Sequence, residues 1–163
     1  MHSDISMETK VFHRVSRLIL HVKQLEHGKD LPLPSYATEN SAGMDLYAAI
    51  EDALTIEVGK RTLVPTGICL EIPAGYEGQV RPRSGLALKH GIGMVNAPGT
   101  IDSDYRGEIG VILINLGDRP YVIHRGDRIA QLIISPVMRV QVSQAIELNE
   151  SGRGDGGFGH SGV

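Results

Sequence analysis

The sequence is poor in aromatic residues and in cysteine, and it has no tryptophan. Five Tyr and two Phe are all the aromatic residues among its 163, so the core must be built from Val, Ile, Leu, Ala and Met. The single cysteine, Cys69, excludes an intrachain disulfide and a cysteine-rich zinc site. We expect it to be a small buried hydrophobic residue of a protein from a reducing compartment.

Long apolar runs and strong charge are also missing. No run approaches the ~18 residues of a membrane helix, and the N-terminus lacks the basic-then-apolar order of a signal peptide. The formal net charge of −3 gives no electrostatic footprint for long nucleic acid. A cytoplasmic protein without nucleic-acid or membrane partners is therefore expected, although a locally charged cleft can still bind a small polyanion.

Between residues 43 and 144, short segments rich in Val, Ile and Thr alternate with Gly, Pro, Asn and Asp. This pattern predicts an all-β domain, either a sandwich, a jelly roll or a barrel. The only expected helix is residues 84–90, with Ser84 as a possible N-cap and Gly91 just beyond its end. The expected strands are residues 17–22, 54–58, 66–72, 78–81, 108–115, 121–124, 128–134 and 137–142.

The two ends of the chain differ from this domain. Residues 1–15 are polar and irregular, and we expect a disordered segment before a β domain of residues 16–148. Half of residues 152–163 are glycine, so this stretch cannot hold a packed structure alone. Its Arg153 and Phe158 are unlike a plain linker, and we interpret residues 149–163 as a mobile arm that closes over a site.

Several apparent motifs have simpler explanations. The G-x-G-x-x-G pattern at residues 154–159 follows no βαβ unit and opens no helix, so it is not a dinucleotide fingerprint. The Arg-Gly-Asp tripeptides that begin at Arg125 and Arg153 are interpreted as turns. The histidines are scattered without the spacing of a zinc site.

Five segments remain, and each has a structural alternative when taken alone. Residues 42–49 are a strand with one acid, Asp45. Residues 81–87 place Arg83 before Ser84 and Gly85 at a helix start, which suits either anion binding or a simple cap. In residues 126–133, Gln131 interrupts an apolar strand and is either a functional or a solvent-facing position.

The third segment, residues 96–107, is the densest in polar side chains. Turn chemistry explains Pro98, Gly99 and Gly107. It does not explain why Asp102 and Tyr105 occur together before a strongly apolar strand, and functional loops on β scaffolds have this character. The glycine-rich arm is the fifth segment.

Together the five segments resemble the motifs of the trimeric dUTPase family, in order and in register over residues 16–163. The resemblance implies a jelly-roll-like (β-clip) all-β domain that assembles as a homotrimer. It also implies active sites built from more than one subunit, with the C-terminal arm closing over a neighbour's site. The activity implied is hydrolysis of dUTP to dUMP and pyrophosphate.

By this resemblance Asp102 would be the general base for a water that attacks the α-phosphorus in line. Mg²⁺ would be held by substrate phosphates and water without a direct protein ligand, and Asp45 would support its water shell or the site's arginine. The phosphates would be bound by Arg83, Ser84, Gly85 and Gln131, and the γ-phosphate by Arg153.

Base and sugar selection would lie in the third segment and the arm. The amide of Asn96 and the backbone from Thr100 through Ile101 to Asp102 would match the polar edge of uracil. Tyr105 would stack under the deoxyribose and exclude a 2′-hydroxyl, and Phe158 would stack over the base. The arm departs from the family's usual Ser-Thr with His160-Ser161, which bears on a hydroxyl contact to phosphate.

Two other interpretations fit the sequence less well. The related dCTP deaminases carry a catalytic Glu where Ile112 stands, and an apolar side chain cannot shuttle protons. The other is a non-catalytic trimer that binds nucleotide and regulates a partner by arm closure; because all the candidate catalytic side chains are present, this would be an added role rather than a replacement.

Overall fold

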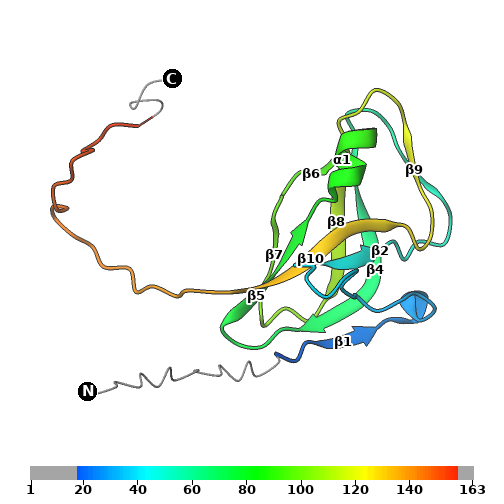
Figure 1. The fold of residues 1–163 in the computed structure, drawn as a ribbon, viewed down its shortest axis with the longest axis horizontal. Helices are drawn as coiled ribbons and strands as arrows, with labels where there is room; N and C mark the ends of the chain where they lie inside the picture. The colour runs from blue at the N-terminus through cyan, green and yellow to red at the C-terminus, as the bar shows by residue number, and fades with distance from the viewer. Residues whose placement is uncertain (1–17, 158–163) are drawn as a thin grey trace, which may run out of the picture.

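The computed structural model describes residues 18–157 of the chain, as two four-stranded antiparallel sheets and a two-stranded ribbon (Figure 1). The predicted disordered segment of residues 1–15 lies outside the described residues. Within them, the expected all-β, jelly-roll-like fold is confirmed.

The first sheet has β8 (Glu108–Asn115) and β4 (Arg61–Glu71) at its centre. Along β8 every second residue is buried, because successive side chains of a strand point to opposite faces and only one face meets the core. The edge strands are β1 (His21–Gln24), which is followed by a 3₁₀ turn, η1 (Glu26–Gly28), and β6 (Ile92–Met94).

The second sheet has the order β2 (Met44–Tyr47), β10 (Arg128–Pro136), β5 (Tyr76–Arg81) and β7 (Gly99–Ile101). The separate ribbon pairs β3 (Leu54–Ile56) with β9 (Tyr121–Ile123). One continuous core contains buried aliphatic side chains of both large sheets, among them Leu46, Val80, Val111 and Leu132. Full burial of each such side chain stabilises the fold by roughly 1.5–3 kcal/mol.

The helix α1 (Ser84–His90) has the predicted bounds. Gly91 ends it with φ at 68°, in the left-handed region that glycine adopts without steric cost, and its N–H bonds back to carbonyls of the last turn. A Cβ at Gly91 would also lie 2.5 Å from the backbone of Gly117, so this helix end packs closely against the turn that follows β8.

Several strand predictions are corrected. Residues 137–142 are not a strand, because β10 ends at Pro136 and no strand within residues 18–157 pairs beyond it. β4 begins at Arg61 and runs through Pro65, so it starts before the predicted strand of residues 66–72. The proline is tolerated because β1 pairs only with residues 68–71 of β4, and the ladder to β8 is irregular between Pro65 and Cys69. Cys69 itself is only partly buried.

Beyond β10 the chain leaves the body, and residues 137–157 run away from it without strand or α-helix (Figure 1). Every second residue at the start of this segment is apolar and strongly exposed: Met138, Val140 and Val142. In residues 18–157 no helix is long and apolar enough to cross a membrane.

Candidate active site

A row of polar side chains crosses the outer face of the second sheet. In the strand register, Asp45 of β2 lies opposite Gln131 of β10, and Gln131 lies opposite Arg81 of β5. Their neighbours on the other face, such as Leu132 and Val80, are buried in the core. Period-two alternation therefore brings the first, second and fourth sequence segments together on one surface.

Asp45 is the anchor of this row. It is only 6% exposed, and Arg128 Nη1 donates a 3.1 Å hydrogen bond to its Oδ2. Arg83 Nε lies 3.3 Å from Oδ1, but its direction is too poor for a hydrogen bond, so Oδ1 has charge contact without a donor. Arg83 Nη1 donates instead to the carbonyl of Arg128 at 3.1 Å. One buried carboxylate thus holds two arginines from different segments.

The segment after β5 presents the other predicted phosphate-binding residues. The N-cap of α1 is Arg83, in an extended conformation and without a side-chain cap, so the interpretation of Ser84 as N-cap is wrong by one position. Ser84 is the first helical residue, and it is exposed together with Gly85. The Ser84 hydroxyl forms no hydrogen bond within the described residues, so it is free to bind a ligand.

Tyr121 reports on the charges beside Arg83. Burial raises the pKa of its phenol, the carboxylate of Asp127 raises the pKa further, and the positive charge of Arg83 acts in the opposite direction. Asp127 forms no ion pair with Arg83 in the described chain, and its Oδ2 accepts the backbone N–H of His124 at 2.8 Å.

A second polar group lies on residues 96–107, the segment that contains β7 and is called the hairpin below. Asp102, directly after β7, is exposed, and its side chain forms no hydrogen bond or ion pair with the rest of the described chain. Tyr105 folds back over Gly107, where a Cβ would lie against the phenol oxygen. Its hydroxyl donates to the carbonyl of Glu108 at 3.0 Å, which holds the ring in place although it is 45% exposed.

At the other end of the hairpin, Asn96 precedes a turn that contains the cis Ala97–Pro98 bond. A Cβ on Gly99 would lie 3.2 Å from Asn96 Nδ2, so glycine leaves the amide room beside the strand. Thr100 is exposed and Ile101 is partly buried. The third segment was interpreted as a loop, and β7 shows that its centre is instead an edge strand.

Asp102 and Arg83 lie near opposite ends of β5 in one chain. β7 is antiparallel to β5, with Ile101 opposite Gly78 and Gly99 opposite Val80, so Asp102 is level with Glu77 near the start of β5, whereas Arg83 follows its end. At about 3.3 Å per residue this separates their backbones by roughly 15–20 Å. A pocket of about 290 Å³ beside Asp102 is lined by Tyr105, Glu108 and Ile112, and by no residue of the Asp45 row.

The arm contributes one described candidate. Arg153 is exposed in a turn and donates from Nε to the carbonyl of Gly156 at 2.6 Å. Phe158, His160 and Ser161 lie outside the described residues.

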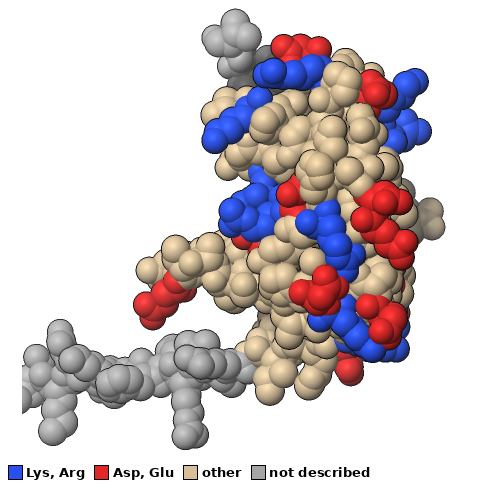
Figure 2. Space-filling model, turned by 90° about the vertical axis from the view of Figure 1, so that its right-hand side faces the viewer, with Lys and Arg blue, Asp and Glu red and all other residues tan. Residues whose placement is uncertain are grey.

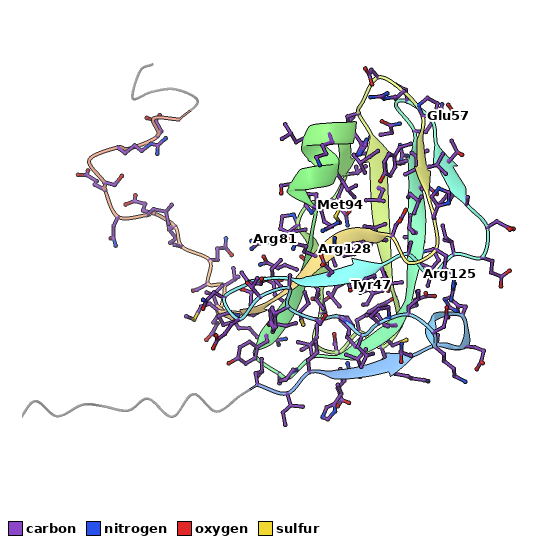
Figure 3. The ribbon with its side chains drawn as sticks, turned by 45° about the vertical axis from the view of Figure 1, so that its right-hand side comes forward. Tyr47, Glu57, Arg81, Met94, Arg125 and Arg128 are labelled. Carbon is purple, nitrogen blue, oxygen red and sulfur yellow. The ribbon has the colours of Figure 1, made fainter. Side chains whose placement is uncertain are left out.

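The residue that sequence reasoning missed is Arg128, the second arginine on Asp45. A signal was present, because Arg128 lies in the fourth segment three residues before Gln131, at the start of β10. Figure 3 shows Arg128 and Arg81 in the region where β10 and β5 are paired, whereas Arg125 and Glu57 lie farther off. Over the face in Figure 2, basic and acidic side chains are interspersed rather than separated by sign.

Comparisons with known proteins agree with this architecture. The family model for dUTPase matches residues 29–162. A deoxyuridine 5'-triphosphate nucleotidohydrolase of Wolbachia sp. subsp. Drosophila simulans is 59% identical over 149 residues, covering 90% of this chain and 97% of that protein. The protein of the same name from Aquifex aeolicus is 64% identical over 128 residues, covering 78% of this chain and 85% of the relative.

Among solved structures, a mutant dUTPase of Staphylococcus bacteriophage 80alpha with dUpNHpp superposes with a TM-score of 0.80 at 28% identity, covering 89% of this chain and 99% of that one. The chain therefore belongs to the dUTPase family. These matches also confirm the prediction that the protein is a nucleotide hydrolase of the dUTP diphosphatase type.

Proposed function

We propose that the protein cuts dUTP to dUMP and pyrophosphate by in-line attack of water on the α-phosphorus. The observation that carries the proposal is that the chain presents two different carboxylates. Asp45 is buried and holds arginines on the sheet face, whereas Asp102 on the hairpin is exposed and has no partner in the described chain. The arginines held by the first suit a phosphate chain, and the second suits proton abstraction from water. Phosphoryl transfer needs mainly such positioning and charge stabilisation.

Asp102 is proposed as the general base. Its carboxylate is exposed and has no partner in the described chain, so it can accept a hydrogen bond from the attacking water and then its proton. Asp45 cannot take this role, because it is buried and already holds Arg83 and Arg128. The two acids of the family motifs thus have different tasks.

The phosphates are proposed to bind along the row. Arg83 offers a planar guanidinium, and Gln131 offers an amide at the centre of the sheet face. Ser84 and Gly85 are exposed beside Arg83 and can donate from a hydroxyl and from backbone N–H groups. Asp45 acts by holding the guanidinium of Arg83, which the rigid sheet keeps oriented.

The hairpin is proposed to select the nucleoside. The Asn96 amide and the backbone of residues 100–102 offer donors and acceptors for the polar edge of uracil, and cytosine would leave some of them unpaired. Tyr105, held over Gly107 by its bond to Glu108, offers a flat surface for the deoxyribose and no room for a 2′-hydroxyl.

A homotrimer with shared active sites is proposed, and the separation of Asp102 from Arg83 supports the sharing. Because these two residues lie near opposite ends of β5, we expect the hairpin of one subunit and the row of another to form each site together. The exposed apolar residues of the departing segment also need a cover, and Met138, Val140 and Val142 alternate as a strand does when it pairs with another chain.

Mg²⁺ is the proposed cofactor. Among residues 18–157 no three His, Cys, Asp or Glu side chains are grouped to hold a metal ion, and Asp45 Oδ1 is a buried hard oxygen with no donor in the described chain. These residues fit an ion that binds mostly to substrate phosphates and water. When bound, Mg²⁺ offsets the charge that develops on the phosphates. A mutant dUTPase of phage phi11 of S. aureus has a structural Mg(II) ion, with a TM-score of 0.70 at 25% identity.

The arm, residues 149–163, is proposed to close over the bound nucleotide of a shared site. Arg153 would then exchange its bond to Gly156 for the γ-phosphate, and Phe158 would cover the base. The activity would keep uracil out of DNA and supply dUMP for thymidylate synthesis. A cytoplasmic location is proposed, because the single Cys69 leaves no intrachain disulfide to form, as in proteins of reducing compartments.

The test is pyrophosphate release by the purified protein with Mg²⁺ on dUTP, dCTP, dTTP and UTP, with the base of each product identified. Strong preference for dUTP and a uracil monophosphate product are expected. No turnover from a folded, assembled protein that binds dUTP would overturn the proposal and favour a nucleotide-binding regulator.

A further inference from the structure

Three arginines reach the outer face of the second sheet. Arg83 and Arg128 share the carboxylate of Asp45. Arg81 is the third, opposite Gln131 in the register and two residues before Arg83. Asp127, a second nearby acid, accepts the backbone N–H of His124 and forms no ion pair within residues 18–157. Of the three arginines, Arg81 is therefore the one that contacts no carboxylate in the described chain.

Arg81 differs from the other two arginines in its partner. Its Nε and Nη2 both donate to the side-chain carbonyl of Gln79, at 3.2 and 2.5 Å. It forms no ion pair with any acid in the described part of the chain. The side-chain nitrogen of Gln79 in turn donates to Glu77 Oε1 at 2.8 Å. The acid that these bonds link to Arg81 is therefore Glu77, four residues before Arg81 on the strand.

The contact between Arg81 and Gln79 is weak and lies at the protein surface. Arg81 is exposed, and a hydrogen bond between a guanidinium and a neutral amide is weaker than one between a guanidinium and a phosphate. The side chain also borders an open hollow of about 440 Å³, together with Pro82, Ala97 and Pro98. An anion arriving along the row can therefore replace Gln79 without breaking an ion pair.

We propose that Arg81 is a further phosphate-binding residue, which leaves Gln79 and binds the β- and γ-phosphates of the nucleotide. Most of the triphosphate's charge lies on these groups, and more develops there as pyrophosphate leaves. Gln79 competes with the substrate for the guanidinium, and displacing this neutral amide costs less than breaking an ion pair would. This assignment rests on the proposed nucleotide site.

The experiment compares Arg81→Gln with the wild-type protein, using dUTP turnover and calorimetric binding of inorganic tripolyphosphate and of dUMP. Loss of one charge-assisted phosphate contact is expected to raise the KM for dUTP and the Kd for tripolyphosphate roughly tenfold, with dUMP binding unchanged. Arg61→Gln is the matched control, because Arg61 is an exposed arginine on the other sheet and should change neither value.

A second variant separates binding from a merely structural role. Gln79→Leu removes the holding amide and leaves Arg81 free, so tripolyphosphate should bind as tightly as before or more tightly. If Gln79→Leu weakens it as much as Arg81→Gln does, or if Arg81→Gln leaves its binding unchanged, the assignment is overturned. Tripolyphosphate binding that depends on Arg81, in a protein that does not turn over dUTP, would support the assignment while the proposed function fails.

Discussion

The two ends of β5 present side chains in different states. At its C-terminal end, the buried carboxylate of Asp45 joins Arg83 and Arg128 across the sheet. Near its N-terminal end, the side chain of Asp102 is exposed and forms no bond within the described chain. The difference teaches that one chain orders the group around Asp45 by itself, whereas Asp102 is left without a partner in the described chain, as expected if a ligand and a second subunit complete the proposed site.

The largest effect is expected at the open end. Asp102→Asn keeps the shape of the side chain but removes the base, so dUTP turnover should fall by about 10²–10⁴-fold while dUTP binding persists. Asp104→Asn, two residues on in the same hairpin, is the control and should retain turnover. Steady-state rates and calorimetric titration measure both; retained turnover in Asp102→Asn would remove it from its role.

Mixed assembly tests whether the two ends act across subunits. Arg83→Ala and Asp102→Asn chains should each be nearly inactive alone. If each site combines one chain's row with another's hairpin, random trimers of the two should recover roughly a quarter of the wild-type rate. Co-refolded mixtures measure this, and no recovery above the separate variants would place both groups in one chain's site.

Removing the arm should weaken the link between the two ends. Deletion of residues 152–163 should cost most of the dUTP turnover, because Arg153 and the aromatic cover are lost, while thermal unfolding and assembly stay unchanged. Arg153→Gln in the full-length chain isolates the phosphate contact and should cost less. A deleted protein with the wild-type rate would contradict closure by the arm.

The preference for dUTP over UTP should change only when the hairpin is altered. Tyr105→Ala removes the ring over Gly107 and should reduce the preference for dUTP over UTP about tenfold in competition. Tyr105→Phe loses only the bond to Glu108 and should keep most of the preference. Unchanged selectivity in Tyr105→Ala would exclude a sugar-sensing role.

The smallest effect is expected outside both groups. The hydrogen bond from Arg125 holds the pKa of Asp30 below its ordinary value. A lowered folded-state pKa adds stability above the unfolded pKa of 3.8, which is lost as the pH falls through the folded value. Asp30→Asn should therefore lower the melting temperature slightly at pH 7, with the difference from wild type vanishing in acid, and it should leave dUTP kinetics unchanged.

Local patterns were sufficient where the cause is local. Alternation of Val, Ile and Thr predicted most strands, and the Gly91 stop predicted the end of α1. They failed at β7 and at residues 137–142, where the outcome depends on the partner strand. β7 pairs with β5, whereas residues 137–142 have no partner strand in the described part of the chain. Arg128 was missed for the same reason, since its role exists only through Asp45, 83 residues away.

The sequence by itself determined the all-β class, the family and the chemical types of the candidate site residues, because strand periodicity, turn residues and five ordered segments are local properties. Only the tertiary structure decided which of these residues meet. Strand register placed Asp45, Gln131 and Arg81 in one row and sent Asp102 to the other end of β5, because pairing between distant strands sets both the face and the position of every side chain.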